Sequence, residues 1–260
     1  AISKKTRAII PVHYAGVSCD MDAIINIAKE HDLYIIEDAA QCTYSFEDGK
    51  HIGHKGDFSA FSFHETKNIH CGNGGMLCVN NSNFIEKAEI ARDKGSNRQM
   101  FLSGQVDKYS WVDKGSSYFM SDLQAAFLFH QLENANDVTK RRLLLWNNYY
   151  KGLKQLDLDS YFTIPKQEKG HNAHIFYLKF NSEKDLIDLQ THLKKQSIQA
   201  VTHYVPLHNS KAGLTYGKTP FELVNCEAFN HKILRIPLHL DLTSDDTDAV
   251  INQIKLFYRG

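Results

Sequence analysis

The feature that most constrains the fold is an alternation of short apolar runs with helical spacing near the start of the chain. The apolar run AIIPV, residues 8–12, is followed by helical spacing from Met21 to His31 and by a second apolar run, LYII, at residues 33–36. Continuous apolar runs of this length are typical of parallel strands covered on both faces, and a helix between two of them makes a βαβ unit. The sequence therefore predicts an α/β fold with a mainly parallel sheet flanked by helices.

A change of composition later in the chain predicts two domains. Ser121 and Gln124 have the form of a capping box, which opens a helix that runs, with a break, to about Leu153. Residues 157–172 then contain Pro165, Gly170 and many polar side chains. We therefore expect a large domain at 1–153 and a smaller C-terminal α/β domain at 154–260. The expected strands lie at 58–63, 76–79, 174–180, 199–205 and 233–236, and the expected later helices at 183–196 and 245–258.

Composition excludes several classes of protein. Lysine and arginine together number 30 and balance 30 acidic residues without a long run of one sign, so a nucleic-acid-binding footprint is absent. No apolar stretch approaches membrane-spanning length and no segment has the form of a signal peptide, which predicts a soluble, cytoplasmic protein. The 5 cysteines contain no CxxC pair, so neither a disulfide framework nor a thiolate zinc site is expected.

Two adjacent carboxylates follow the second apolar run, in LYIIEDAAQ. Glu37 and Asp38 stand at the carboxyl end of this expected strand, where open α/β sheets place their ligand crevice. Successive strand residues face opposite sides of a sheet, so the two side chains cannot both point into one site. We expect one carboxylate to be functional and the other structural.

A lysine follows the next expected strand, in FSFHETKNIHCGNGG at residues 61–75. Lys67 comes after an aromatic-rich run and before a glycine-rich one, in a loop that could reach the same sheet edge as Glu37 and Asp38. An ion pair is the commonest meaning of such an arrangement. Pyridoxal phosphate (PLP) chemistry needs the same two groups, because a lysine amine forms a Schiff base with the cofactor aldehyde and a carboxylate keeps the pyridine nitrogen protonated. Spacing alone leaves both interpretations open.

Other interpretations of this loop are weaker. His64, His70 and Cys71 do not have recognisable metal-ligand spacing, so no metal site is expected. The glycine run at 72–75 lacks the lysine-serine end of a P-loop, and it is better explained as a turn beside a ligand.

Several long blocks carry a family resemblance over essentially the whole chain. FSFHETKN, with EDAAQ before it and CGNGG and GSSYFMSDLQAA after it, resembles the DegT/DnrJ/EryC1/StrS sugar aminotransferases, which are PLP enzymes of fold type I. PVHYAGVSCDMD and DKGSSYFMSDLQAAF are similar to members that aminate dTDP-4-keto-6-deoxyglucose to dTDP-4-amino-4,6-dideoxygalactose, with glutamate as donor. The resemblance implies a role in the biosynthesis of cell-surface polysaccharide, such as lipopolysaccharide or enterobacterial common antigen.

The resemblance also implies roles for single residues. Lys67 matches the Schiff-base lysine and Asp38 the aspartate on the pyridine nitrogen, while Gln41 matches a residue against the cofactor ring or its 3-hydroxyl. Ser62 matches a hydroxyl that binds the cofactor phosphate. The family's relatives that remove a sugar hydroxyl have histidine at the lysine position, so Lys67 favours amino transfer.

Ser117 stands where many relatives have an asparagine that reaches the phosphate in the neighbouring subunit. The resemblance therefore implies a homodimer with shared active sites. The helix that begins after Ser121 carries more apolar residues than one packed face requires, which is consistent with a subunit interface. His203, Tyr204 and His208, in THYVPLH, lie where relatives bring a loop toward the substrate.

The family also has a phosphate-holding turn and a ring-stacking aromatic residue upstream of AIIPV, and neither is found in this sequence. Roughly the first hundred residues of such an enzyme are therefore expected to be missing. The alternative hypothesis is a fragment or non-catalytic family member that keeps the fold and dimerises without turnover.

Overall fold

The computed structural model describes residues 1–259, which form two compact units. The N-terminal unit is Thr6–Asn136, and the C-terminal unit comprises residues 137–259 together with Ala1–Lys5. The two units divide at residue 136, near the start of a helix that runs to Lys154. The domain boundary predicted from the sequence lies at the end of the same helix, at residue 153, and stays a prediction. Side chains of this helix are part of the C-terminal core. No helix in residues 1–259 is long and apolar enough to cross a membrane.

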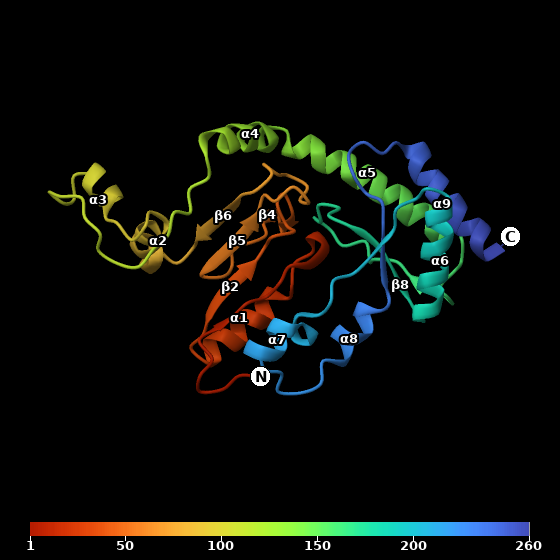
Figure 1. The fold of residues 1–260 in the computed structure, drawn as a ribbon, viewed down its shortest axis with the longest axis horizontal. Coiled ribbons are helices and arrows are strands. Elements are labelled where there is room, and N and C mark those ends of the chain that lie inside the picture. Colours follow the sequence, from red (N-terminus) through yellow and green to blue (C-terminus); the bar gives the residue numbers. More distant parts are fainter. Residues whose placement is uncertain (260) are drawn as a thin grey trace. The chain divides into compact units, whose positions relative to one another are not determined.

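The N-terminal unit is built on a four-stranded sheet with the order β1-β2-β5-β6. Strands β1 (Ala8–Ile9), β2 (Tyr34–Asp38) and β5 (Phe58–Ser62) are parallel, as predicted, and β6 (Gly75–Val79) is antiparallel to β5. Figure 1 shows β2, β5 and β6 side by side. This order brings the carboxyl ends of β2 and β5 to one edge of the sheet.

Helix α1 (Met21–Glu30) makes the βαβ crossover between β1 and β2. The Asp20 side chain caps it by accepting a hydrogen bond from Ala23 N, and Met21 and Ala28 pack with Ile35 in a small core. The other elements of this unit are short: η1 (Tyr14–Gly16), β3 (Phe46–Glu47), β4 (Lys50–His51), η2 (Ser82–Phe84), α2 (Ile85–Arg92) and α3 (Arg98–Leu102).

The long helical segment after Ser121 is confirmed, together with its break. Helix α4 (Asp122–Glu133) ends at Asn134, and α5 (Ala135–Lys154) begins directly afterwards. The predicted capping box is also present, because the Ser121 side chain accepts from Gln124 N while the Gln124 side chain accepts from Ser121 N.

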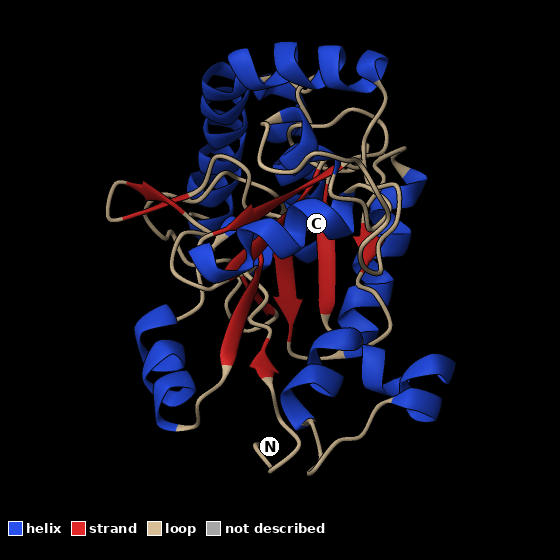
Figure 2. Ribbon diagram, turned by 90° about the vertical axis from the view of Figure 1, so that its left-hand side faces the viewer, coloured by secondary structure: helices blue, strands red, loops and turns tan. Residues whose placement is uncertain are grey.

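The C-terminal unit contains an antiparallel sheet with the order β7-β8-β10-β9. Its strands are β7 (Phe162–Thr163), β8 (Phe176–Phe180), β9 (Val201–Thr202) and β10 (Ile233–Ile236), and its helices are α6 (Glu183–Lys195), η3 (Leu207–Asn209), α7 (Lys211–Tyr216), α8 (Val224–Asn230) and α9 (Ser244–Arg259). In Figure 2, which draws both units, strands are red and helices are blue. The strand predicted at 199–205 is shorter than expected, because β9 is an edge strand that pairs with β10 only at Val201 and Thr202.

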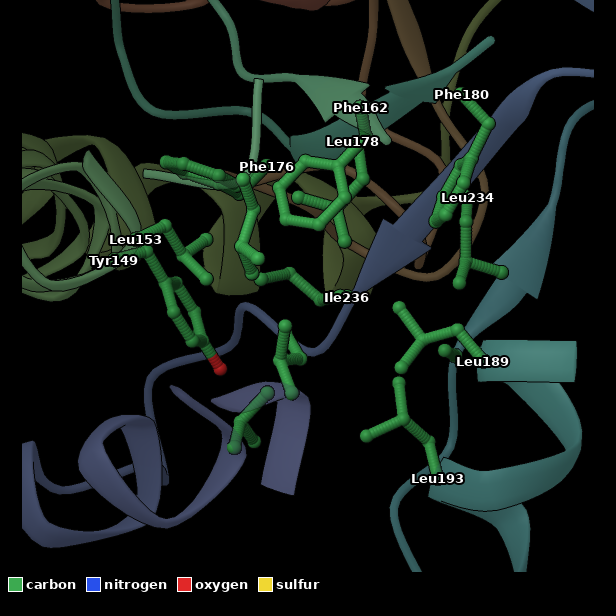
Figure 3. Packing of buried hydrophobic residues seen from close by; sticks show 14 of the residues in the cluster. Tyr149, Leu153, Phe162, Phe176, Leu178, Phe180, Leu189, Leu193, Leu234 and Ile236 are labelled. Carbon is green, nitrogen blue, oxygen red and sulfur yellow. The ribbon is translucent and has the colours of Figure 1, made fainter. Parts of the chain in front are cut away.

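The core of the C-terminal unit lies between its sheet and three helices. Tyr149 and Leu153 come from α5, Leu189 and Leu193 from α6, and Phe176, Leu178 and Leu234 from the sheet, as Figure 3 shows. Val250 and Ile254 come from the third helix, α9. Phe176 lies 5.3 Å from the Tyr149 ring, centroid to centroid. Because α5 contributes to this core, it belongs structurally to the C-terminal unit.

Glu37, near the end of β2, is a buried carboxylate with three hydrogen bonds. Its side chain is 1% exposed, and Oε2 lies 2.8 Å from His13 Nε2. Oε1 accepts hydrogen bonds from Lys55 N at 2.9 Å and from Gly56 N. Burial alone would raise the pKa of Glu37, but the hydrogen bonds from His13, Gly56 and Lys55 outweigh it and lower the pKa below its ordinary value.

His13 joins this carboxylate to the segment that follows β1. Its Nδ1 accepts a hydrogen bond from Cys19 N at 3.1 Å, so the neutral ring carries its proton on Nε2 and donates it to Glu37. The backbone makes a second connection, because His13 N donates to Asp38 O at 3.0 Å and Asp38 N donates to Pro11 O at 2.9 Å. The end of β2 is therefore fixed by both side chains and backbone.

Glu37→Gln is expected to lower the free energy of unfolding at pH 7 by on the order of 3 kcal/mol. Both Glu37 oxygens accept hydrogen bonds, whereas a glutamine has one oxygen, so its NH₂ group would face one of the donors, such as the Nε2 proton of His13. The lowered pKa means that the Glu37 contribution is fully present above the unfolded-state value near 4.5 and is lost as pH falls through the folded-state pKa. Urea unfolding between pH 7 and pH 3 should therefore show a shallower acid-side loss in the variant. The exposed Glu86→Gln is the control, and an unchanged pH dependence in Glu37→Gln would contradict the assignment.

Candidate active site

The carboxyl ends of β2 and β5 carry the residues that the sequence analysis singled out. Asp38 is the last residue of β2 and pairs in register with Ala60 of β5, and Ser62 is the last residue of β5. Val12 forms a parallel bridge with Asp38 from the other side. The strand order thus places Asp38 in the middle of the sheet edge, between the segment after β1 and the loop after β5.

Asp38 and Glu37 face opposite sides of the sheet, as the strand period requires. Both oxygens of the Glu37 carboxylate already accept the buried hydrogen bonds described above. Asp38 is only half-buried, and its Oδ1 accepts a hydrogen bond from Ala40 N at 3.0 Å. No residue in 1–259 forms an ion pair with the Asp38 carboxylate within 4.0 Å. The expectation that one of the two carboxylates is structural is met by Glu37.

Gln41 lies just beyond the end of β2. Its Oε1 accepts a hydrogen bond from Ala15 N at 2.7 Å, and Ala15 has a positive φ of 57°. This contact ties the Gln41 side chain to the same segment that holds Glu37 and Asp38. Cys42 follows in the core, and its burial raises the pKa of the thiol to about 12, so this thiol is not a nucleophile at neutral pH.

Lys67 stands in the loop between β5 and β6, which is closed by backbone hydrogen bonds. Phe63 N donates to Gly74 O at 2.8 Å, Glu65 N to Gly72 O at 2.9 Å, and Cys71 N to Phe63 O at 3.0 Å. Gly72 has a φ of +81°, a conformation in which a side chain would be strained. Lys67 N donates to His64 O at 2.9 Å, so the lysine backbone is held in a turn.

The Lys67 ammonium is half-buried and has no acidic partner. Its Nζ makes no hydrogen bond or ion pair with any residue in the described part of the chain. The ion-pair interpretation of Lys67 with Asp38 or Glu37 is therefore not met in this structure. An amine in the loop after β5 and a carboxylate at the end of the neighbouring strand β2 therefore remain available.

The other predicted site residues lie in several places. Ser62 Oγ accepts a hydrogen bond from His64 N at 3.3 Å, so this hydroxyl is at the base of the Lys67 loop. Ser117 is exposed and bridges Asp93 in an antiparallel pairing. His203, Tyr204 and His208 belong to the C-terminal unit. Tyr204 there lies 5.2 Å from the Arg235 guanidinium, measured to the ring centroid, and His208 Nε2 lies 3.4 Å from Glu227 Oε1.

Among residues 1–259, no group of three His, Cys, Asp or Glu side chains is placed so that it could hold a metal ion. His64 Nδ1 instead lies 3.0 Å from Thr66 Oγ1. The cysteines are all free: Cys19, Cys42, Cys71, Cys78 and Cys226.

The residues at the sheet edge fit pyridoxal phosphate by the chemistry of their donor set. The cofactor needs a primary amine for its aldehyde and an anionic carboxylate for its pyridine nitrogen, and Lys67 and Asp38 supply both without being neutralised by another residue. Hydroxyl and amide groups of Ser62 and Gln41 accompany them. His13, which holds this edge through Glu37, was missed by sequence reasoning because its partner is 24 residues away.

Comparison with known proteins gives a consistent result. The model of the DegT/DnrJ/EryC1/StrS aminotransferase family matches residues 1–255. An uncharacterized protein of Methanocaldococcus jannaschii is 37% identical, over 98% of this chain and 68% of its own length. The spore coat polysaccharide biosynthesis protein SpsC of Bacillus subtilis is 30% identical, over 100% of this chain and 69% of its own length.

Solved structures agree with these relatives. S. venezuelae DesV, solved in complex with a ketimine intermediate, has a TM-score of 0.86 and 30% identity over 100% of this chain and 67% of that chain. An aminotransferase from Psychrobacter cryohalolentis has a TM-score of 0.89 at 23% identity, over 99% of this chain and 70% of that chain, which shows the shared fold. The chain therefore belongs to the DegT/DnrJ/EryC1/StrS aminotransferase family, whose members are pyridoxal phosphate enzymes.

Proposed function

We propose that this protein transfers an amino group from glutamate to a nucleotide-linked keto sugar, with Lys67 as the lysine that binds the cofactor aldehyde. The observation that carries the proposal is an amine and a carboxylate on adjacent parts of the sheet, Lys67 in the loop after β5 and Asp38 at the end of the neighbouring β2, neither of which has an ion-pair partner in the described residues. Family membership gives this pair its meaning, because the same two groups are what PLP chemistry requires.

Each residue of the site has a separate task in this proposal. When bound, PLP supplies an aldehyde that carries the amino group and a pyridine ring that accepts electrons. Asp38 would accept a hydrogen bond from the pyridine N–H and so hold the proton at that nitrogen. Lys67 Nζ would accept and return a proton as the amino group is transferred. Ser62 would donate its hydroxyl to the phosphate, and Gln41 would orient the ring.

A relative's name and the sequence blocks support the proposed substrate class. The name of SpsC describes a role in spore coat polysaccharide biosynthesis, which supports a sugar substrate for this chain as well. Within that class we propose dTDP-4-keto-6-deoxyglucose as the acceptor, dTDP-4-amino-4,6-dideoxygalactose as the product, and use of the product in cell-surface polysaccharide. His203, Tyr204 and His208 are proposed to line the substrate side. A cytoplasmic location stays a prediction.

The first test is covalent labelling of Lys67. The protein is incubated with PLP, reduced with borohydride and digested, and the labelled peptide is identified by mass spectrometry. We expect the label on Lys67 in the wild type, its loss in Lys67→Ala, and no change in Lys50→Ala, because Lys50 is an exposed strand lysine beside a glycine. A label that persists in Lys67→Ala would reject the proposed function, and so would a wild-type chain that takes up no cofactor.

We also propose that the enzyme is a homodimer whose active sites are shared. Helix α4 has only one buried side chain, Leu128, whereas Leu123 is 86% exposed and Phe129 is 64% exposed. An apolar helix face of this kind is costly to leave in water and suits a second copy of the chain. Ser117, a few residues before α4, would then reach the phosphate of the neighbouring site.

The test of sharing is complementation between inactive full-length subunits. Lys67→Ala subunits are mixed with subunits carrying Ser117→Trp and allowed to exchange at equal concentration. Half of the dimers are then mixed and each contains one intact site, so about one quarter of the wild-type activity should return. Two copies of the same variant serve as the control. No recovery, despite subunit exchange shown by native mass spectrometry, would contradict the shared site.

A further inference from the structure

The loop that carries Lys67 is tied to helix α4 by one side chain, Gln124. Gln124 Nε2 donates a hydrogen bond to Asn73 O at 2.8 Å, although the two residues are 51 positions apart. The same side chain accepts from Ser121 N at 3.2 Å and from Ser121 Oγ at 3.0 Å through Oε1. One amide group therefore closes the capping box of α4 with its oxygen and holds the Lys67 loop with its nitrogen.

The Gln124 side chain binds the loop where backbone hydrogen bonds close it. Asn73 lies between Gly72, which accepts from Glu65 N, and Gly74, which accepts from Phe63 N. A Cβ on Gly74 would lie 2.7 Å from Cys71 Sγ and 3.2 Å from Met120 Cε, so the loop lies close to Met120, which precedes the α4 N-cap Ser121. The Asn73 carbonyl that Gln124 binds therefore lies in the segment whose backbone hydrogen bonds close the Lys67 loop.

A ring contact accompanies the hydrogen bond between α4 and this loop. Leu128 is the one buried side chain of the helix, and the ring of His70 lies 6.0 Å from that of Phe127, centroid to centroid. The bond from Gln124 Nε2 to Asn73 O is a side-chain hydrogen bond between α4 and the Lys67 loop. A directional bond at this position would decide where the loop stands relative to the helix.

We propose that Gln124 is a positioning residue for Lys67, holding the lysine loop against α4. This inference rests on the proposed function, in which Lys67 is the cofactor lysine. The inference adds that α4 positions the loop that carries the Lys67 amine. Because the outer face of α4 is apolar, a partner that packs on α4 would also affect the position of Lys67.

Glutamate at position 124 separates the two tasks of the glutamine. In Gln124→Glu, the carboxylate can still accept from Ser121 and complete the capping box, which favours glutamate as much as glutamine. It cannot donate to Asn73 O, and it would face that carbonyl with a like partial charge. Ser121→Ala is the matched control, because it removes the Ser121 hydroxyl from the cap and leaves the Gln124 bond to Asn73 in place.

The primary measurement is amide hydrogen exchange of the full chain without cofactor. In Gln124→Glu the amides of Phe63, Glu65 and Cys71 should exchange about five- to tenfold faster than in the wild type, while the first turn of α4 is unchanged. Ser121→Ala should give the reverse pattern. Unchanged loop exchange in Gln124→Glu would overturn the inference, and so would equal acceleration of loop and helix in both variants.

The second readout follows the lysine itself. The rate of Lys67 labelling by PLP and borohydride is measured against pH, with recovery of the unlabelled Lys50 peptide as the reference for the amount of digest. Gln124→Glu should slow Lys67 labelling about tenfold with unchanged recovery of the Lys50 peptide, whereas Ser121→Ala should label like the wild type. Faster loop exchange with normal labelling would mean that Gln124 does not position Lys67. A wild-type chain unlabelled at Lys67 would instead reject the proposed function, while the exchange result would still stand.

Discussion

The buried carboxylate of Glu37 is the interaction on which the active-site edge depends. It receives hydrogen bonds from the His13 ring and from two backbone amides, and His13 is in turn oriented by Cys19 N. A charge with 1% exposure is tolerated only because these groups replace water. With Glu37 committed to one face of β2, strand geometry turns Asp38 to the other face, where its carboxylate stays available.

The lysine side of the site depends on a different kind of constraint. Lys67 is held by a loop closed through backbone hydrogen bonds, and this loop is joined to α4 through Gln124. Asp38 is therefore fixed by the sheet itself, whereas Lys67 is fixed by a turn and one helix contact. A rigid carboxylate and a more adjustable amine suit a reaction in which the amine must release and retake the cofactor.

Local patterns predicted much of this arrangement. The βαβ unit, a broken helix after Ser121, the capping box at Ser121 and the opposite orientation of Glu37 and Asp38 all follow from periodicity and short-range signals, whereas the position of the break at Asn134 was not predicted. The bonds from His13 to Glu37 and from Gln124 to Asn73 could not be predicted, because they join residues 24 and 51 positions apart and leave no periodic signal. Short elements such as the β3–β4 hairpin and α7 were also not anticipated.

The central claim is that adjacent carboxylates have separate roles, Glu37 in the fold and Asp38 toward the cofactor. Urea unfolding with and without saturating PLP tests it, because a ligand that binds only the folded state raises the free energy of unfolding. Asp38→Asn should keep the stability of the cofactor-free protein and lose most of the increase that PLP gives. Glu37→Gln should lose stability in both conditions and keep that increase. A full PLP-dependent increase in Asp38→Asn would contradict the account.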